Sequence, residues 1–178
     1  YPPEINNSNR ANYTRFTCKQ TDASQIRSPK VKKKIKRKNS EGNINIALVL
    51  KTGGDTYNAK YVNALAKNIS NNVTIPYTLN VLTDDESGFD RDYVHNVIPF
   101  KHNFKGWWSK IELFRPGIFK GDRVFYMDLD TVIVKNIDEL LTWDVTFAGI
   151  RDLYHHTFMQ TGLMTWNPNY NHQVYENF

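Results

Sequence analysis

The first half of residues 43–178 contains several short hydrophobic runs and one stretch in which apolar residues recur with the period of a helix. Runs rich in β-branched and other large apolar residues predict strands at 43–50, 77–83 and 93–100. Residues 59–69 instead place apolar side chains three and four positions apart, which is the spacing of one helical face. The chain is therefore expected to begin its folded part as strand, helix, strand, strand.

The second half continues this alternation. Residues 107–114 predict a helix, which Pro116 and Gly117 end. The later elements are a buried strand at 123–127, a further apolar run at 131–134, one or two helical turns at 136–141, and strands at 145–150 and 162–166. This order is typical of an α/β fold, in which a mainly parallel, Rossmann-like sheet is flanked by helices.

Polar segments stand at the ends of three of the predicted strands. They are KTGGD (51–55), TDD (83–85) and DLD (128–130). Ligands of open α/β sheets bind at the carboxyl ends of the strands. We therefore expect these three segments to lie along one rim of the sheet and to form the candidate site.

Asp128 and Asp130 are the most informative of these residues. In extended backbone, residues two apart point to the same side with Cα atoms about 7 Å apart. Bare carboxylates are costly to bury and repel each other, so the pair needs a counter-ion or solvent. Mg²⁺ and Mn²⁺ favour oxygen ligands and are often held by carboxylates together with substrate phosphates. The alternative is that both are ordinary polar residues where a strand stops.

Charge separates the chain into two regions. Residues 1–42 carry eleven Lys or Arg against three acids, a net of +8, whereas residues 43–178 carry twelve against fifteen, a net of −3. We predict a mostly disordered basic tail at 1–42 and one domain at 43–178. The basic run from Lys30 to Lys38 is either a solvated linker or a weak contact for an anionic membrane surface. No aromatic residues interleave these lysines, so we expect no nucleic acid partner.

The apolar runs and the cysteine count exclude further kinds of protein and site. No apolar run approaches the roughly 20 residues of a membrane span. The single cysteine, Cys18, allows neither an internal disulfide nor a zinc site built from cysteines. We therefore expect a cytoplasmic or membrane-peripheral protein.

The segment GWWSKIELFRPGIFKGDRVFYMDLDTVIVKNIDELL (106–141) resembles nucleotide-sugar glycosyltransferases of the GT-A fold. It looks most like the family 8 group, which includes glycogenin and the bacterial lipooligosaccharide galactosyltransferases. Residues 46–65 (IALVLKTGGDTYNAKYVNAL) resemble the first strand, nucleotide loop and helix of that family. Residues 156–168 (HTFMQTGLMTWNP) resemble its later strand beside the sugar site.

The resemblance implies a role for each matching residue. Asp128 and Asp130 would hold Mn²⁺ or Mg²⁺ against the diphosphate of a nucleotide-sugar donor, in this family most often a UDP-sugar. The loop from Thr52 to Tyr57, with Gly53 and Gly54, would receive the nucleotide base. Other candidates are Asp84 at the base or ribose, Lys110 at the donor sugar or phosphates, and Arg151, Asp152 and Gln160 near the sugar and the acceptor. Each of these has an alternative as an ordinary turn, loop or helix residue.

Two parts of the family pattern have no counterpart in this sequence. The third metal ligand of the family is a histidine far downstream, and His155, His156 and His172 do not match its position. The family's downstream Asp-Gln pair is also missing. We therefore expect the C-terminal part of such a domain to lie beyond Phe178.

The sequence thus predicts a metal-dependent transferase that moves a sugar from a nucleotide sugar to an acceptor hydroxyl. The acceptor would be a glycan, a lipid-linked sugar or a protein. A haloacid-dehalogenase-type phosphatase is an alternative, because MDLDTV also fits its motif, with Asp128 as nucleophile and Asp130 as acid or base. A domain that binds nucleotide without catalysis is the third possibility.

Overall fold

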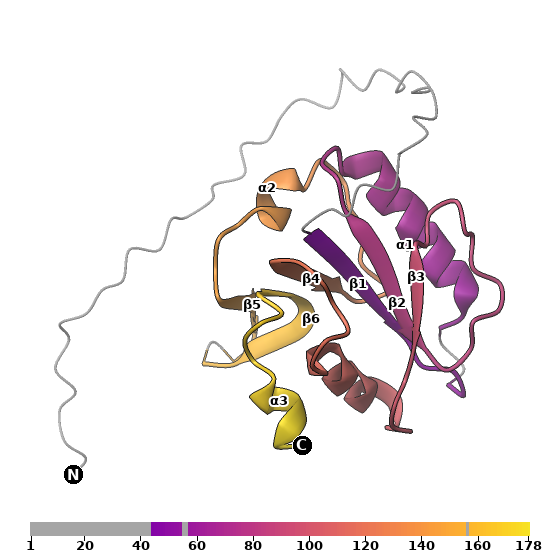
Figure 1. Cartoon of the computed structure of the whole chain (residues 1–178). Helices are drawn as coiled ribbons and strands as arrows, with labels where there is room; N and C mark the ends of the chain where they lie inside the picture. The colour runs from indigo at the N-terminus through magenta and orange to yellow at the C-terminus, as the bar shows by residue number, and fades with distance from the viewer. Residues whose placement is uncertain (1–43, 55–56, 156) are drawn as a thin grey trace, which may run out of the picture. The chain divides into compact units, whose positions relative to one another are not determined.

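The strands form one six-stranded sheet, and helices lie on both of its faces (Figure 1). The computed structural model describes residues 44–54, 57–155 and 157–178. All of them belong to one compact unit. The predicted basic tail at 1–42 lies outside the described residues, and its boundary stays a prediction.

The sheet is mainly parallel, as predicted. Its strands are β1 (Ile44–Leu50), β2 (Thr78–Thr83), β3 (Asn96–Pro99), β4 (Arg123–Met127), β5 (Phe147–Arg151) and β6 (Met159–Trp166), in the spatial order β3-β2-β1-β4-β6-β5. The first four run parallel, whereas β6 is antiparallel to β4 and β5 is antiparallel to β6. The start of β6 therefore lies beside the end of β4, which brings residues near 160 to the rim that carries Asp128.

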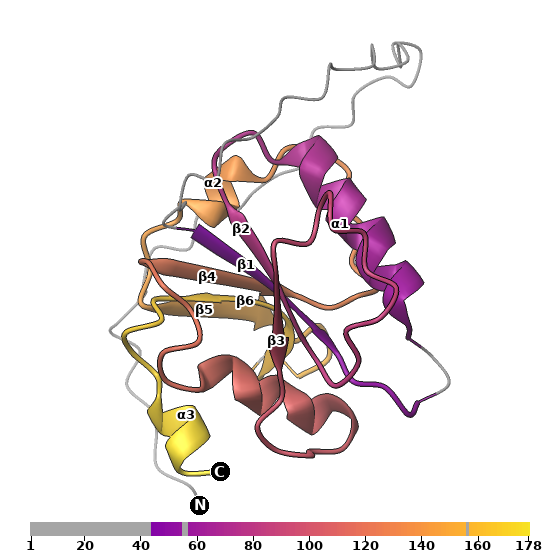
Figure 2. The same cartoon turned by 45° about the vertical axis from the view of Figure 1, so that its right-hand side comes forward.

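Helix α1 (Ala59–Asn72) covers one face of the sheet (Figure 2). The helix begins at Asn58, whose side chain accepts a hydrogen bond from the backbone N–H of Lys60 at 3.0 Å. Side chains that alternate along β1 meet the apolar stripe of α1 in one core cluster, which includes Ile46, Leu48, Leu50, Val62, Leu65, Ala66 and Ile69. This packing fixes the position of Tyr57, which directly precedes the helix cap.

The opposite face is covered by η2 (Gly106–Phe114) and the loop that follows it (Figure 2). The second core cluster lies here and contains Ala47, Leu82, Leu113, Phe114, Phe119, Val124, Tyr126, Met164 and Trp166. The ring centres of Phe114 and Trp166 are 4.8 Å apart, so η2 is held directly against β6.

The helix predicted at 107–114 forms, but it is a 3₁₀ helix rather than an α-helix. A period of three residues places Gly106, Ser109 and Glu112 in one line. Ser109 donates to a carbonyl of the preceding loop, and Glu112 accepts from two backbone N–H groups of that loop at 2.7 and 3.1 Å. These three bonds all lie on the side of η2 that faces this loop.

The apolar run at 131–134 forms neither a strand nor a helix. The backbone N–H of Ile133 donates to the side chain of Asn68 on α1 at 2.8 Å. Ile133 is buried under the helix, whereas Val132 and Val134 are exposed. The segment is therefore fixed by side-chain hydrogen bonds to α1 and not by a neighbouring strand. It leads to the short helix α2 (Asp138–Leu141), and α3 (Gln173–Glu176) follows β6.

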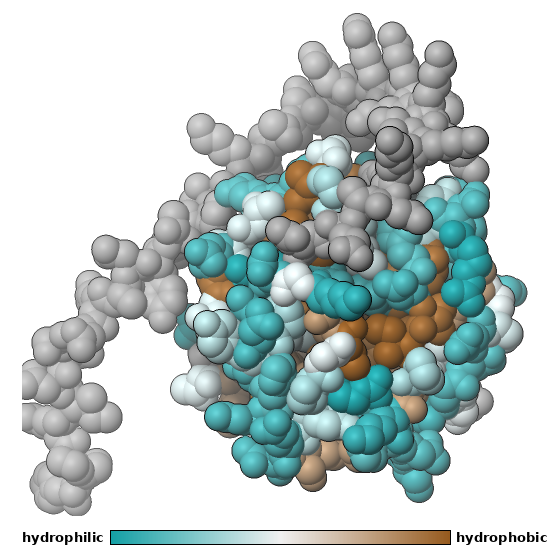
Figure 3. Space-filling view, viewed as in Figure 1, coloured by the Kyte–Doolittle hydropathy of each residue, from teal (hydrophilic) through white to brown (hydrophobic). Residues whose placement is uncertain are grey.

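Most of the face in Figure 3 is hydrophilic, with a hydrophobic area on the side where β2 and β3 lie. Within the described part of the chain, none of the helices has both the length and the apolar character that crossing a bilayer requires.

Candidate functional site

The chain turns where β4 ends, and the DLD segment lies in this turn. The N–H of Asp128 still donates to the carbonyl of Gly162 on β6 at 2.8 Å. The N–H of Thr131 then donates back to the carbonyl of Asp128 at 3.1 Å, which closes a turn over Leu129 and Asp130. The extended backbone that would aim both aspartates to one side therefore ends at Asp128. Leu129 is buried, Asp128 is partly exposed, and Asp130 faces solvent.

Asp128 is paired with a lysine and a tyrosine. Lys110 Nζ of η2 lies 2.7 Å from Oδ1 and 3.0 Å from Oδ2 of Asp128. The hydroxyl of Tyr126 donates to Oδ1 of the same carboxylate. Burial first, and then the charge of Asp128, raises the pKa of Tyr126, so this phenol remains a neutral donor. The role expected for Lys110, at the donor sugar or phosphates, stays a prediction.

Tyr126 is a residue that the sequence reasoning missed. It lies in β4, two positions before Asp128, which directly follows the strand, and the two side chains meet in a hydrogen bond. A tyrosine two residues before a strand-end carboxylate was the available signal. The ring of Tyr126 also lies under Lys110, with Nζ at 5.4 Å from its centre.

Asp130 contacts the loop that precedes α1. The hydroxyl of Tyr57 donates to Oδ2 of Asp130 at 3.2 Å. Burial, followed by the charge of Asp130, raises the pKa of Tyr57. The Tyr57 ring packs edge-on against Tyr61 of α1, with ring centres 5.1 Å apart. The fold therefore joins two segments more than seventy residues apart in the sequence.

These five residues form one electrostatic unit, which we name the DLD cluster: Tyr57, Lys110, Tyr126, Asp128 and Asp130. The charge of Asp128 also raises the pKa of Tyr57, and the charge of Asp130 also raises that of Tyr126. Each carboxylate is therefore close enough to act on both phenols. The cluster holds two negative charges, one positive charge and two neutral donors.

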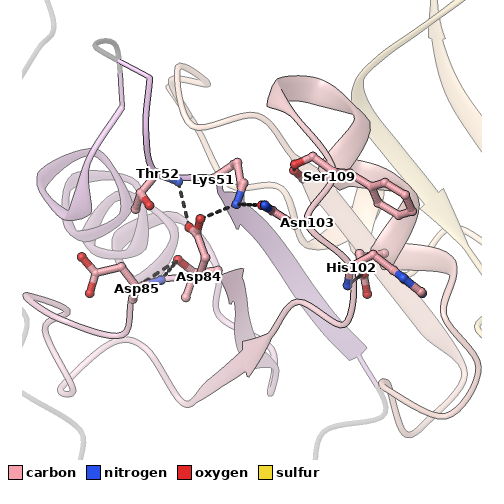
Figure 4. Close-up of polar contacts among 10 residues, drawn as sticks. Lys51, Thr52, Asp84, Asp85, His102, Asn103 and Ser109 are labelled. Carbon is pink, nitrogen blue, oxygen red and sulfur yellow. Dashed lines mark hydrogen bonds and ion pairs between the residues drawn. The ribbon is translucent and has the colours of Figure 1, made fainter.

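A second group lies at the carboxyl ends of β1 and β2 (Figure 4). Asp84 accepts a hydrogen bond from Lys51 and another from the backbone N–H of Thr52 at 2.8 Å. Lys51 Nζ also donates to the side chain of Asn103, in the loop after β3, at 2.9 Å. The predicted rim therefore includes Lys51, Thr52 and Asp84, and the structure adds Asn103 to it.

The pKa of Asp84 reflects these contacts. Partial burial raises it, but the hydrogen bonds from Lys51 and Thr52 together outweigh burial and lower it. Asp84 is therefore an anion whose oxygens already have donors. Its predicted role at a base or ribose stays a prediction.

The glycine loop is only partly described. Gly53 has a φ of +89°, a conformation that glycine adopts without strain, and both Gly53 and Gly54 are exposed. Asp55 and Thr56 lie outside the described residues. The role of this loop as the base-binding segment stays a prediction.

Asp152 and Gln160 lie together in the hairpin between β5 and β6. Gln160 Nε2 donates to Asp152 at 3.4 Å, and Asp152 also accepts from the backbone N–H groups of Tyr154 and His155 at 2.8 and 2.7 Å. Asp152 directly follows β5 beside exposed Arg151, and Gln160 lies near the start of β6. The hydrogen bonds mainly order the hairpin, so catalytic roles for Asp152 and Gln160 stay predictions. His156 lies outside the described residues.

Gly162 allows the Asp128 carboxylate to lie close to β6. A Cβ atom at Gly162 would be 3.3 Å from Oδ2 of Asp128, which is tighter than an ordinary contact. A side chain there would therefore press on the carboxylate. This glycine belongs to the segment 156–168, which resembles the later family 8 strand beside the sugar site.

The sequence reasoning also missed Glu112, a fully buried carboxylate on η2. It bonds to Arg115 at 2.7 Å and to the backbone N–H groups of residues 101 and 102. The loop that it fixes carries Asn103, the partner of Lys51. Glu112 therefore supports the rim without being exposed to a ligand.

The described residues contain no group of three or more His, Cys, Asp or Glu side chains placed to hold a metal ion. Asp128 and Asp130 supply two carboxylates, and Mg²⁺ sites of nucleotide enzymes often use one or two carboxylates with substrate phosphates. The two aspartates fit that type of site, in which the remaining ligands come from the substrate and water.

Comparisons with known proteins identify the fold. No protein-family model matches the chain, and no curated protein sequence matches it. Glycosyltransferase GlyE from Streptococcus pneumoniae TIGR4 is similar in structure, with a TM-score of 0.52, 12% identity, and coverage of 74% of this chain and 35% of GlyE. Its apo form gives a TM-score of 0.50 at 12% identity, covering 75% of this chain and 35% of GlyE. The apo structure of WbbM, a bifunctional glycosyltransferase, gives 0.53 at 15% identity, covering 79% and 34%.

The chain spans about a third of the length of these proteins. At such low identity the similarity establishes the fold. The predicted α/β architecture, a mainly parallel sheet flanked by helices as in glycosyltransferases, is confirmed.

Proposed function

We propose that this chain is the nucleotide-binding part of a metal-dependent glycosyltransferase that uses a UDP-sugar donor. The DLD cluster is the observation that carries this proposal. It places two strand-end carboxylates beside Tyr57, which precedes α1, and Lys110 of η2, on a sheet that has a glycosyltransferase fold. The resemblance of residues 106–141 to family 8 enzymes supports the same assignment.

Asp128 and Asp130 would hold Mn²⁺ or Mg²⁺ in this proposal. The bound cation would offset the negative charge that develops on the departing diphosphate. Lys110 would place a further positive charge beside the diphosphate, since it already lies at Asp128. Tyr126 would keep the Asp128 carboxylate in place through its hydroxyl.

The nucleoside would lie toward the ends of β1 and β2. Tyr57 would offer its ring or its hydroxyl to the uracil, and Asp84 would face the base or the ribose. Lys51 and Thr52 hold the Asp84 carboxylate in a fixed orientation, which favours a specific polar contact over a mobile surface acid. Gln160 and Asp152 would lie on the side of the transferred sugar.

In the reaction, the bond between the anomeric carbon and the diphosphate oxygen breaks with its electron pair leaving on the phosphate. A bond forms between that carbon and the oxygen of the acceptor hydroxyl, which gives up its proton. The products are the glycosylated acceptor and UDP. Acceptors of the proposed class are a glycan, a lipid-linked sugar or a protein hydroxyl.

The geometry supports the alternative hypothesis, a phosphatase, less well. It requires Asp128 to attack a phosphate as a free nucleophile. Both carboxylate oxygens of Asp128 instead have hydrogen-bond donors, from Lys110 and Tyr126. These bonds withdraw charge from the oxygens, which suits a fixed binding group better than a nucleophile.

The proposal is tested by calorimetric titration of UDP with and without Mn²⁺. The wild-type chain should bind UDP more tightly with Mn²⁺, and Asp128→Ala and Asp130→Ala should remove this gain while the circular dichroism spectrum is unchanged. Mn²⁺-independent UDP binding, or undiminished gain in both variants, would contradict the proposal. A parallel assay for UDP release from UDP-sugars separates a transferase from a domain that only binds, and phosphate release from a monoester would identify a phosphatase.

A further inference from the structure

The 3₁₀ geometry of η2 aligns three side chains that an α-helix would spread apart. In a 3₁₀ helix residues three apart lie directly above one another, with a rise of about 6 Å over the three residues. Trp107, Lys110 and Leu113 therefore share one face of η2. Leu113 is buried in the core and Lys110 reaches Asp128, so the next position along this face lies at the outer margin of the DLD cluster.

Trp107 occupies that position and is 76% exposed. No ring contact or cation–π contact of Trp107 is found among the described residues. Its neighbour Trp108 differs, because it stands on another face of η2 and its ring lies 5.3 Å from that of Phe178. Trp108 thus packs against Phe178, whereas Trp107 presents its indole to solvent one helical turn from Lys110.

An exposed indole beside charged groups matches the chemistry of a sugar ring. The C–H groups on one face of a pyranose carry slight positive charge, and the face of an indole is negative. The ring hydroxyls at the edge of the sugar need polar partners, which the DLD cluster offers from Lys110, one turn along η2 from Trp107. Ligand sites commonly combine aromatic side chains with a few placed polar groups.

We propose that Trp107 forms a stacking surface for a pyranose ring of the acceptor, at the margin of the DLD cluster. This inference rests on the proposed function for the identity of the ring as an acceptor. The donor diphosphate is assigned to Asp128 and Asp130, and Lys110 stands between those aspartates and Trp107. A ring on Trp107 is thus on the far side of Lys110 from the diphosphate, where an incoming acceptor would lie.

The chain itself provides the controls for a binding test. It contains four tryptophans, so a ¹⁵N-indole spectrum has four side-chain signals. Trp143 is 55% exposed and follows α2, and Trp166 is buried in the second core cluster. Trp143 reports unspecific stacking of sugars on any exposed indole, and Trp166 reports a change in the fold.

The full chain is titrated with methyl β-glucoside and methyl β-galactoside, with glycerol as a polyol that lacks a pyranose face. We expect at least one glycoside to shift the Trp107 signal while Trp143 and Trp166 stay unchanged and glycerol has no effect. Trp107→Ala should lower saturation transfer from the protein to the ring protons of the glycoside by about three- to tenfold, in the range of aromatic stacking. Trp108→Ala should retain the transfer, and Trp107→Phe should retain part of it.

Equal shifts of Trp107 and Trp143, or no Trp107 shift with either glycoside, would overturn the inference. UDP titration of the same sample separates this result from failure of the proposed function. If UDP and Mn²⁺ bind but the glycosides leave Trp107 unchanged, the stacking surface is wrong and the transferase proposal stands. If the glycosides shift Trp107 but UDP does not bind, the sugar surface is supported and the transferase proposal is wrong.

Discussion

Replacement of Lys110 by methionine should change the affinities for metal and for nucleotide in opposite directions. Lys110 is the cation that lies on Asp128, at 2.7 Å from one oxygen and 3.0 Å from the other. A divalent cation that binds Asp128 must share this carboxylate with the ammonium group. Methionine keeps most of the side-chain length and its packing over Tyr126, but it removes the positive charge.

The structure sets the size of the effect on metal binding. The side chains of Lys110 and Asp128 are 20% and 32% exposed, so solvent screens the pair in part. Such pairs contribute at most about 1 kcal/mol after desolvation and ordering are counted. Loss of the competing ammonium should therefore tighten binding of Mn²⁺ alone by about fivefold.

The affinity for UDP should instead decrease in Lys110→Met. If Lys110 contributes a charged hydrogen bond to the diphosphate, its loss costs about 1.5–3 kcal/mol. This exceeds the gain in metal affinity, so the Kd for UDP at saturating Mn²⁺ should rise by about tenfold.

Electron paramagnetic resonance of free Mn²⁺ measures the first affinity, and calorimetry with UDP measures the second. Lys67→Met is the matched control, because it removes one positive charge from an exposed position on α1. Equal weakening of both ligands in Lys110→Met would show that the lysine only stabilises the fold of the site. Affinities within twofold of wild type for both ligands would refute the reasoning about a shared carboxylate.

Three further substitutions test other parts of the molecule. Tyr57→Ala should weaken binding of both uridine and UDP by roughly 1–3 kcal/mol if the ring stacks on the base, whereas an effect on stability alone, seen in thermal unfolding, would remove Tyr57 from the pocket. Glu112→Ala should lower the free energy of unfolding by about 3–5 kcal/mol in urea, because Arg115 and two backbone N–H groups lose a buried partner; a loss below 1 kcal/mol would contradict this. Burial raises the pKa of Asp138, but hydrogen bonds from Thr74 and Asn136 outweigh it and lower the pKa below its ordinary value of 3.8. Its stabilising contribution is therefore fully present above pH 3.8 and is lost progressively as the pH falls from there through the lowered folded-state pKa. Asp138→Asn should cost about 1 kcal/mol at pH 7 and progressively less as the pH falls below 3.8 in matched urea unfolding curves, and a cost independent of pH would oppose the assignment.

The hydrophobic pattern alone was sufficient for the architecture of the described domain. Strand-length apolar runs and one amphipathic stretch predicted β1, α1, β2 and β4 with nearly correct bounds, because side-chain periodicity is a local property of the chain. The rule that ligands bind at the carboxyl ends of parallel strands then placed Thr52, Asp84 and Asp128 on one rim. The contact of Asp84 with Thr52 at 2.8 Å confirms that placement for the first two strands.

Other features depended on contacts between distant segments. The run at 131–134 has the composition of a strand, but no partner strand is beside it and Asn68 takes its backbone hydrogen bond. The segment at η2 is a 3₁₀ helix, and its Ser109 and Glu112 bond to the same preceding loop. Periodicity does not report such partners, since they are far away in the sequence or lie outside the helix.

In the candidate site, too, some features followed from the sequence and others only from the tertiary structure. The sequence identified Asp128 and Asp130 as the chemically unusual pair, because two carboxylates directly after a buried strand require compensation. Only the tertiary structure decided which groups compensate them: Lys110 and Tyr126 at Asp128, and Tyr57 at Asp130. A carboxylate attracts whichever donor the fold brings within about 3 Å, and that proximity is set by the packing of α1 and η2 on opposite faces of the sheet.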